Sequence, residues 1–282
     1  MARTSKLLIG YDGSDSADAM LDDLRRAGLP EAAEALVVSV GDVMDLVKRA
    51  AARITADFPT WSVRAESHAG SPARVLMDMA DSWQPDLLVV GSHGRSAAGR
   101  LLLGSVSHKL VSEARCSVRV ARRGVRTKDP RIRNLIGTDG SPNAIAAVEE
   151  VASRHWPPAS EARVVHAIWR DPEPRDEDVD FHEHVALQAA ERVAWRERRA
   201  KEVAETASER LRRAGLVTST LVRPESAKRL LVDEATAWEA DCIFVGATGL
   251  SPFDQLLMGS ASTAVVMNAG CSVEVVRPRR SS

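Results

Sequence analysis

Glycine-rich segments of the same spacing occur at two places, and their residue types suit the binding of an anion. Residues 91–94 read Gly-Ser-His-Gly, and after nine further residues Gly-Ser follows at 104–105. Residues 246–249 read Gly-Ala-Thr-Gly, with Gly-Ser again nine residues later at 259–260. Glycine lets the backbone approach a ligand closely, and free N–H groups at a helix start favour an anion. The spacing predicts two phosphate-binding loops; the alternative is that these glycines serve only turns and packing.

Carboxylates and hydroxyls accompany both loops. Asp12 and Asp139 each follow a short apolar run and precede Gly-Ser, so each is expected at the carboxyl edge of a sheet, near a glycine loop. A ribose hydroxyl or an adenine edge is the expected partner there; an Asx-turn or a helix N-cap is the alternative role. Ser105 with Ser107, and Ser260 with Ser262, are expected to add hydroxyls at the helix starts. The first loop also has Arg95, which suits a charge-assisted bond to phosphate.

An internal repeat explains why the loops occur twice. The run Leu-Ile-Gly before Asp12 returns before Asp139, 127 residues later. A later block, residues 74–86, returns at residues 229–241, displaced by 155 residues. The second copy therefore carries 28 extra residues between about 167 and 217. The chain is one domain written twice.

Each copy alternates short apolar runs with longer helical patterns. In the first copy strands are expected at residues 7–11, 35–40, 61–66, 87–91 and 117–121, and helices at 16–27, 43–56, 72–82 and 104–114. Ser71 is a candidate cap for the helix that starts with Pro72. Apolar strands separated by helices predict an α/β fold of two tandem doubly wound (Rossmann-like) domains, each with a five-stranded, mostly parallel sheet.

Domain boundaries follow from the same reading. We expect a first domain at 1–124, a basic linker at 125–132 and a second domain at 133–282, with a charged helical insertion around 170–214. Residues 182–214 are expected to form one long, partly exposed helix. The linker is expected to be a solvated connector, with nucleic-acid contact as the alternative. His182 and His184 resemble a metal cluster, but two residues apart on a helix they diverge, which favours a charged surface segment.

Composition limits the classes of function. The 282 residues carry a net charge of −1, and no apolar run approaches the length of a membrane span. We therefore expect a cytoplasmic protein that binds neither nucleic acid nor membranes and has no metal site. Three cysteines without a C-x-x-C pair are expected to be small core residues of a reducing compartment. Trp83 and Trp238 recur in the repeat and are expected to pack rather than to stack on a ligand.

Together these motifs resemble universal stress protein domains of the ATP-binding type. The resemblance rests on the Asp-Gly-Ser after the first strand, the helix start at 70–72, the run 86–94, the Gly-x2-Gly-x9-Gly-Ser signature and the last-strand start at 114–118. It implies that the aspartate contacts the nucleoside, that a residue ending the second strand contacts adenine through its backbone, and that the glycine signature holds phosphates. In the first copy the candidate residues are Asp12, Val40, Gly91, His93, Gly94, Arg95, Gly104, Ser105, Val106 and Ser107. In the second copy they are Asp139, Ala167, Gly246, Gly249, Gly259, Ser260, Ala261 and Ser262.

The same resemblance implies a function, with alternatives. It implies a non-catalytic stress-response regulator that binds ATP, with or without Mg²⁺, with at most slow hydrolysis, and in which the two copies pair and a homodimer forms. A nucleotide-independent interaction module of the same fold is the first alternative, and an adenylyl-transferring enzyme is the last. No catalytic set can be assembled from local spacing. The second copy has Thr248 and Leu250 where the first has His93 and Arg95, so it is expected to bind more weakly or to take a less charged nucleotide.

Overall fold

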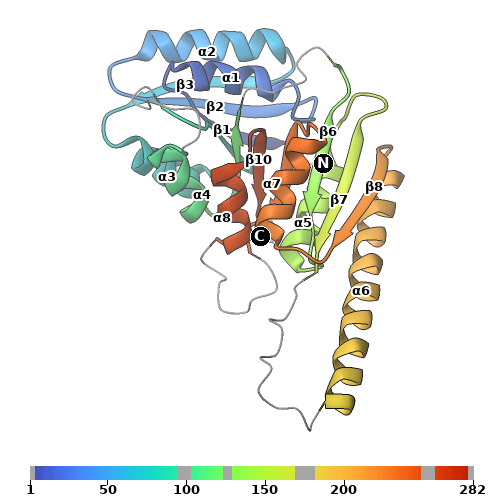
Figure 1. Cartoon of the computed structure of the whole chain (residues 1–282). Coiled ribbons are helices and arrows are strands. Elements are labelled where there is room, and N and C mark those ends of the chain that lie inside the picture. Colours follow the sequence, from blue (N-terminus) through green and yellow to red (C-terminus); the bar gives the residue numbers. More distant parts are fainter. Residues whose placement is uncertain (1–3, 95–102, 123–128, 169–181, 249–257, 279–282) are drawn as a thin grey trace.

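Both copies form the predicted alternation of strands and helices in the computed structural model (Figure 1), which describes residues 4–94, 103–122, 129–168, 182–248 and 258–278. The first copy consists of β1 (Ser5–Gly10), α1 (Asp15–Leu24), β2 (Ala33–Val40), α2 (Met44–Asp57), β3 (Ser62–His68), α3 (Pro72–Trp83), β4 (Leu87–Gly91), α4 (Ser105–Glu113) and β5 (Ser117–Ala121). The second consists of β6 (Arg133–Gly137), α5 (Pro142–Ala152), β7 (Glu161–Ala167), α6 (His182–Arg213), β8 (Val217–Arg223), α7 (Ala227–Ala237), β9 (Cys242–Gly246), α8 (Ser260–Asn268) and β10 (Ser272–Val276).

The two five-stranded sheets join into one sheet. The strand order is β3-β2-β1-β4-β5-β10-β9-β6-β7-β8, and pairing is parallel within each copy. The copies meet edge to edge through the antiparallel pair of β5 and β10. The predicted doubly wound α/β fold is confirmed. The joint between the copies is therefore a strand pair, which leaves neither β5 nor β10 as an open edge.

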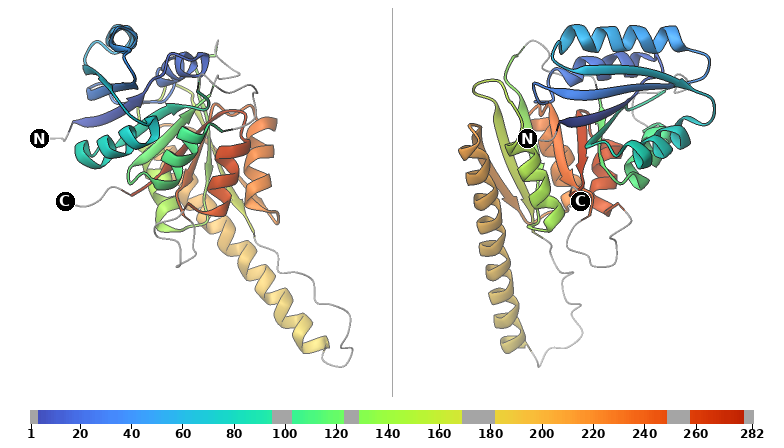
Figure 2. Two further views of the ribbon diagram at one scale, coloured as in Figure 1. Left: turned by 90° about the vertical axis from the view of Figure 1, so that its left-hand side faces the viewer. Right: turned by 180° about the vertical axis from the view of Figure 1, so that it is seen from behind.

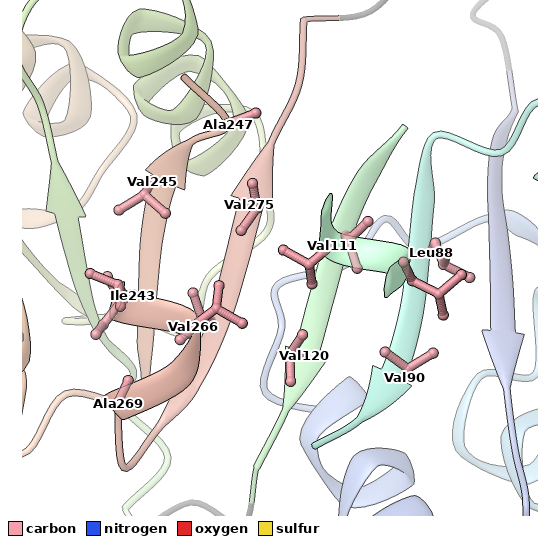
Figure 3. Packing of buried hydrophobic residues seen from close by; sticks show 14 of the residues in the cluster. Leu88, Val90, Val111, Val120, Ile243, Val245, Ala247, Val266, Ala269 and Val275 are labelled. Carbon is pink, nitrogen blue, oxygen red and sulfur yellow. The ribbon is translucent and has the colours of Figure 1, made fainter. Parts of the chain in front are cut away.

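The two faces of the sheet are covered differently. Helices α3, α4, α7 and α8 cover one face and share a single hydrophobic cluster that crosses the joint, with Val120 of β5 and Val275 of β10 among its members (Figure 3). On the other face α1 and α2 cover the first copy, and α5 and α6 cover the second (Figures 1 and 2). Those two helix pairs have separate apolar clusters. Trp83 and Trp238 pack against the shared cluster, as predicted.

Capping separates two kinds of helix start. Ser14 caps α1 by accepting from Ala17 N at 3.2 Å, and Ser141 caps α5 in the same way. Helices α4 and α8 begin after Gly104 and Gly259 without a side-chain cap. The prediction for Ser71 needs correction, because Ser71 stands at the N-cap of α3 but its hydroxyl makes no capping bond. The proline at the first helical position does not explain this difference, because α5 also begins with a proline, Pro142, and Ser141 caps it.

The inserted residues of the second copy form the expected long helix. Helix α6 packs its last half on β7, β8 and α5 through buried apolar residues such as Ala200, Ala204 and Leu211. Its first half projects beyond the sheet (Figures 1 and 2). In the described part of the chain no helix is both long and apolar enough to cross a membrane.

All three cysteines are free thiols within or beside the core, as predicted. Burial raises the pKa of Cys116 to about 11 and that of Cys271 to about 12. Because the thiolate is the reactive form, we expect a thiol reagent at pH 8 to label the native protein slowly and all three cysteines rapidly after denaturation. Fast stoichiometric labelling of the native protein would contradict this packing.

Candidate functional site

A cavity opens in the first copy where the direction of strand succession reverses. Strand β1 lies between β2 and β4, so chain connections leave it toward opposite edges, and ligands of open α/β sheets bind at such switch points. The cavity has a volume of about 300 Å³. Its lining comprises Gly10, Tyr11, Asp12, Ala17, Val38, Ser39, Val40, Pro72, Leu76, Val90, Gly91, His93, Gly94, Gly104, Ser105, Val106 and Ser107.

Asp12 lies beside the glycine loop. Its Oδ1 accepts from Ser14 N at 3.0 Å, which is the Asx-turn considered as an alternative role. A Cβ on Gly94 would lie 3.0 Å from Asp12 Oδ2, so the loop backbone passes directly against the carboxylate. The turn and the cavity position therefore coexist, and the helix cap is Ser14 rather than Asp12.

Gly91 and Gly104 of the first loop differ in how much space surrounds them. A Cβ on Gly91 would lie 2.8 to 3.0 Å from Ser16, including its backbone C and O atoms, so this glycine allows β4 and α1 to pack closely. A Cβ on Gly104 would meet its nearest atom, Ser92 O, at 3.4 Å, an ordinary contact, and the φ of −63° suits any residue. The protein itself does not require glycine at 104. Gly104 is thus the better probe of ligand binding, and substitution of Gly91 tests packing.

Serine hydroxyls tie the loop to its strand. Ser107 Oγ donates to Gly91 O at 2.7 Å, and Ser262 Oγ donates to Gly246 O at 2.6 Å in the second copy. Both serines line their cavities but are buried, so their protons are used within the protein. Ser105 and Ser260, by contrast, are exposed at the helix starts.

A polar network that sequence reasoning missed holds the first loop against α1. Ser16 Oγ lies 3.3 Å from Ser92 Oγ and accepts from His93 N at 3.2 Å, and Ser92 Oγ lies 2.8 Å from His93 Nδ1. His93 Nε2 is buried, and none of the residues that the structure describes forms a hydrogen bond with it. In the second copy Asn143 Nδ2 instead donates to Thr248 Oγ1. Ser16 and Asn143 are equivalent positions of the repeat, 127 residues apart. Two polar residues at equivalent positions were the sequence signal that could have indicated this network.

Tyr11 is a further cavity residue that the sequence did not single out. Its hydroxyl donates to Asp18 Oδ1 at 2.7 Å. Burial and this carboxylate raise the pKa of Tyr11 to about 12, so the phenol stays neutral. The ring therefore presents a fixed, uncharged wall at the end of β1.

The second copy has an equivalent cavity of about 430 Å³ at the carboxyl ends of β6, β7 and β9. Its lining comprises Gly137, Thr138, Asp139, Ala144, Val165, Ala167, Ala227, Leu231, Val245, Gly246, Thr248, Gly259, Ser260, Ala261 and Ser262. Asp139 Oδ1 accepts from Ser141 N at 2.9 Å, which repeats the Asx-turn of the first copy. His166 lies between two cavity residues on β7, and burial lowers its pKa, which keeps it neutral near pH 7.

The structure brings the predicted residues of each copy to a single cavity. All those of the first copy line its cavity except Arg95, and all those of the second except Gly249; these two lie outside the described residues. Their roles in binding stay predictions. No group of three or more metal-ligating side chains occurs among the residues described, a set that leaves out the side chains of His182 and His184.

Comparison with known proteins defines the class. The profile of the universal stress protein family matches residues 46–122 and 132–277. A universal stress protein of Mycobacterium tuberculosis is 32% identical over 248 residues, which is 83% of this chain and 75% of the relative. One from Mycolicibacterium smegmatis is 30% identical over 231 residues, 77% of this chain and 70% of the relative. This chain belongs to the universal stress protein family and is a tandem member, with one family domain in each copy.

Solved structures agree on the fold. A universal stress protein of Archaeoglobus fulgidus aligns over 98% of this chain and 99% of its own, with a TM-score of 0.62 and 17% identity. A protein of unknown function from Pseudomonas aeruginosa aligns over 98% of this chain and 93% of its own, with a TM-score of 0.67 and 13% identity. At these identities the likeness concerns the fold alone.

Proposed function

We propose that this tandem universal stress protein is a cytoplasmic, non-catalytic regulator that binds ATP, with or without Mg²⁺, in its glycine-loop cavities. The observation that carries the proposal is the convergence of Asp12, the glycine loop and the start of α4 on one cavity at the sheet switch point. Because no side chain in the described part of the protein caps α4, we infer that the first-turn N–H groups of the helix can bind an anion at the cavity wall.

The cavity offers different chemistry along its length. Val38, Val40, Leu76 and Val90 provide an apolar part that suits a purine base. The glycine loop and the helix start provide the polar part, where a phosphate chain would receive backbone N–H donors. Asp12 lies beside Gly94 of the glycine loop, where its carboxylate would accept a hydrogen bond from a ribose hydroxyl. The volume of each cavity lies within or near the usual range for small-molecule sites.

Nucleotide binding is expected to stabilise the protein and to depend on Gly104. At an ATP concentration 100 times Kd, mass action adds about 2.7 kcal/mol to the unfolding free energy. Gly104→Ala adds a methyl group to the cavity wall and is expected to weaken ATP binding at the first site at least about tenfold, with an unchanged Tm without ligand. Thermal unfolding and equilibrium dialysis measure the two effects.

Gly270→Ala is the matched control, because a Cβ there has no atom within 4 Å and lies outside both cavities. It should keep wild-type ATP affinity. The proposal fails if saturating Mg-ATP leaves the Tm of the wild type unchanged and protein purified without added nucleotide carries none. A nucleotide-independent module of the same fold predicts that Gly104→Ala and Gly270→Ala behave alike.

A further inference from the structure

A buried network of ion pairs crosses the joint between the copies. Arg119 on β5 bonds Asp23 of α1 at 2.6 and 3.1 Å, and its Nη1 reaches Glu274 of β10 at 3.2 Å. Arg154, just beyond α5, bonds Glu274 and also Glu150 at 3.0 Å. We call these five residues the interface ion network. Arg119 is 1% exposed and Glu274 is 0% exposed, so the central pair is fully removed from water.

The signs of the charges alternate along the network. The network begins and ends with a carboxylate, and each carboxylate is followed by an arginine until the last. The spatial order is Asp23, Arg119, Glu274, Arg154 and Glu150. The first two belong to the first copy and the last three to the second. Neighbouring carboxylates raise the pKa of both arginines against the effect of burial, so both remain charged.

Arg119 and Glu274 are equivalent residues of the repeat. They are 155 residues apart, the same offset that relates residues 74–86 to 229–241. They are also direct partners in the antiparallel register of β5 and β10. The axis that relates the two copies therefore passes between them. If two first copies paired through β5, Arg119 would face a second Arg119; if two second copies paired through β10, Glu274 would face another Glu274.

A set of hydrogen bonds beside the strand pair is symmetric and does not discriminate between these pairings. Arg122 N donates to Ser272 Oγ at 3.0 Å, and Arg277 N donates to Ser117 Oγ at 3.1 Å. Arg122 Nη2 also donates to Val266 O, and Arg277 Nη2 donates to Val111 O, both at 2.6 Å. Equivalent residues make equivalent bonds, so a like-with-like pair would keep them. Other contacts between the copies are not symmetric: Arg26 Nη2 donates to Asp241 Oδ1 and Arg154 Nη1 donates to Ala27 O, both at 2.8 Å. At the axis itself, the copies differ in the charges of Arg119 and Glu274.

We propose that the interface ion network is a pairing code, which directs each first copy to a second copy and excludes like-with-like pairing between chains through β5 or β10. Like charges placed face to face in a desolvated interface cost several kcal/mol, whereas the observed order is complementary. Any homodimer of this protein must then either use a different surface or exchange copies, so that β5 of each chain pairs with β10 of the other. The proposal does not depend on nucleotide binding.

Charge reversal in the full-length chain tests the code. The first variant reverses the first copy with Asp23→Arg and Arg119→Glu; the second reverses the second copy with Glu150→Arg, Arg154→Glu and Glu274→Arg. Each keeps ion pairs within its copies but places like charges at the centre. The third variant combines all five substitutions and restores the alternation with opposite signs. Hydrogen exchange of the amides of β5 and β10 reports pairing, and that of β1 and β6 reports the fold of each copy.

We expect each half-reversed chain to lose protection in β5 and β10 at least about tenfold relative to the wild type. The fully reversed chain should regain most of it, although Ser272 loses its 2.7 Å bond to Asp23. If a half-reversed chain unfolds altogether, a folded and protected fully reversed chain still supports the code. Wild-type protection in both half-reversed chains, or a fully reversed chain no better than they are, would overturn it.

Discussion

Arg119→Met is expected to lower the unfolding free energy by about 3–5 kcal/mol, as removal of one partner from a buried ion pair does. Methionine retains much of the apolar volume, so the loss reports the missing charge more than a cavity. Without the guanidinium, Asp23 keeps the Ser272 hydroxyl but loses two charged bonds, and Glu274 keeps Arg154 alone. Denaturant unfolding followed by circular dichroism measures the change.

Arg74→Met is the matched control. Arg74 pairs with Asp78 on the surface of α3, where the side chains are 83% and 72% exposed, and such pairs contribute little. Addition of Asp23→Leu to Arg119→Met should recover part of the loss, because it removes a buried carboxylate left without its cation. If Arg119→Met costs no more than Arg74→Met, the interface ion network does not stabilise the joint.

The fold and the composition of the cavities were predictable because their signals are local. Apolar strands, helical periodicity and the repeat fix the order of elements, and parallel strands bring their carboxyl ends to one edge. Val40 and Gly91 end their strands and Asp12 lies two residues beyond the end of β1, so the fold alone brings them together. The glycine loop follows from the same logic, because it joins the end of β4 to the start of α4.

The reasons behind individual glycines were not predictable from the motif. Gly91 and Gly104 belong to one signature, yet one is needed for packing against Ser16 and the other leaves room at the cavity wall. A spacing pattern gives no information on which side of the backbone a neighbouring helix lies. Likewise, the contacts among Ser16, Ser92 and His93 join residues 76 and 77 positions apart, and no local pattern links them.

The sequence contains part of the information that defines the joint between the copies. Arg119 stands in Ser-Val-Arg-Val-Ala and Glu274 in Ser-Val-Glu-Val-Val, each a lone charge within an apolar strand. A charge in a buried strand requires a partner, and the repeat makes these two positions equivalent. What the sequence lacks is the antiparallel register that places them face to face. Asp23 and Arg154 enter the network only through helix packing on that face.

Gly246→Val is expected to destabilise the protein by about 3 kcal/mol or more, the upper part of the range for overpacked interiors. Its Cβ would lie 2.6 Å from Asn143 C and 2.8 Å from Ala144 N, the backbone of the first turn of α5. The strand cannot move aside, because β9 pairs with both β6 and β10. Helix α5 must therefore shift off the sheet, which loosens the core around Phe244.

The control is Gly270→Val, where the added side chain meets open space and stability should change by no more than about 0.5 kcal/mol. Thermal unfolding without nucleotide distinguishes the two variants. Gly246 and Gly104 belong to equivalent signatures, so opposite outcomes are informative: lost stability at 246 and lost affinity at 104 would separate a packing glycine from a ligand-facing one. A Gly246→Val protein with wild-type Tm and impaired ATP binding would instead make the first glycine of the signature a ligand contact.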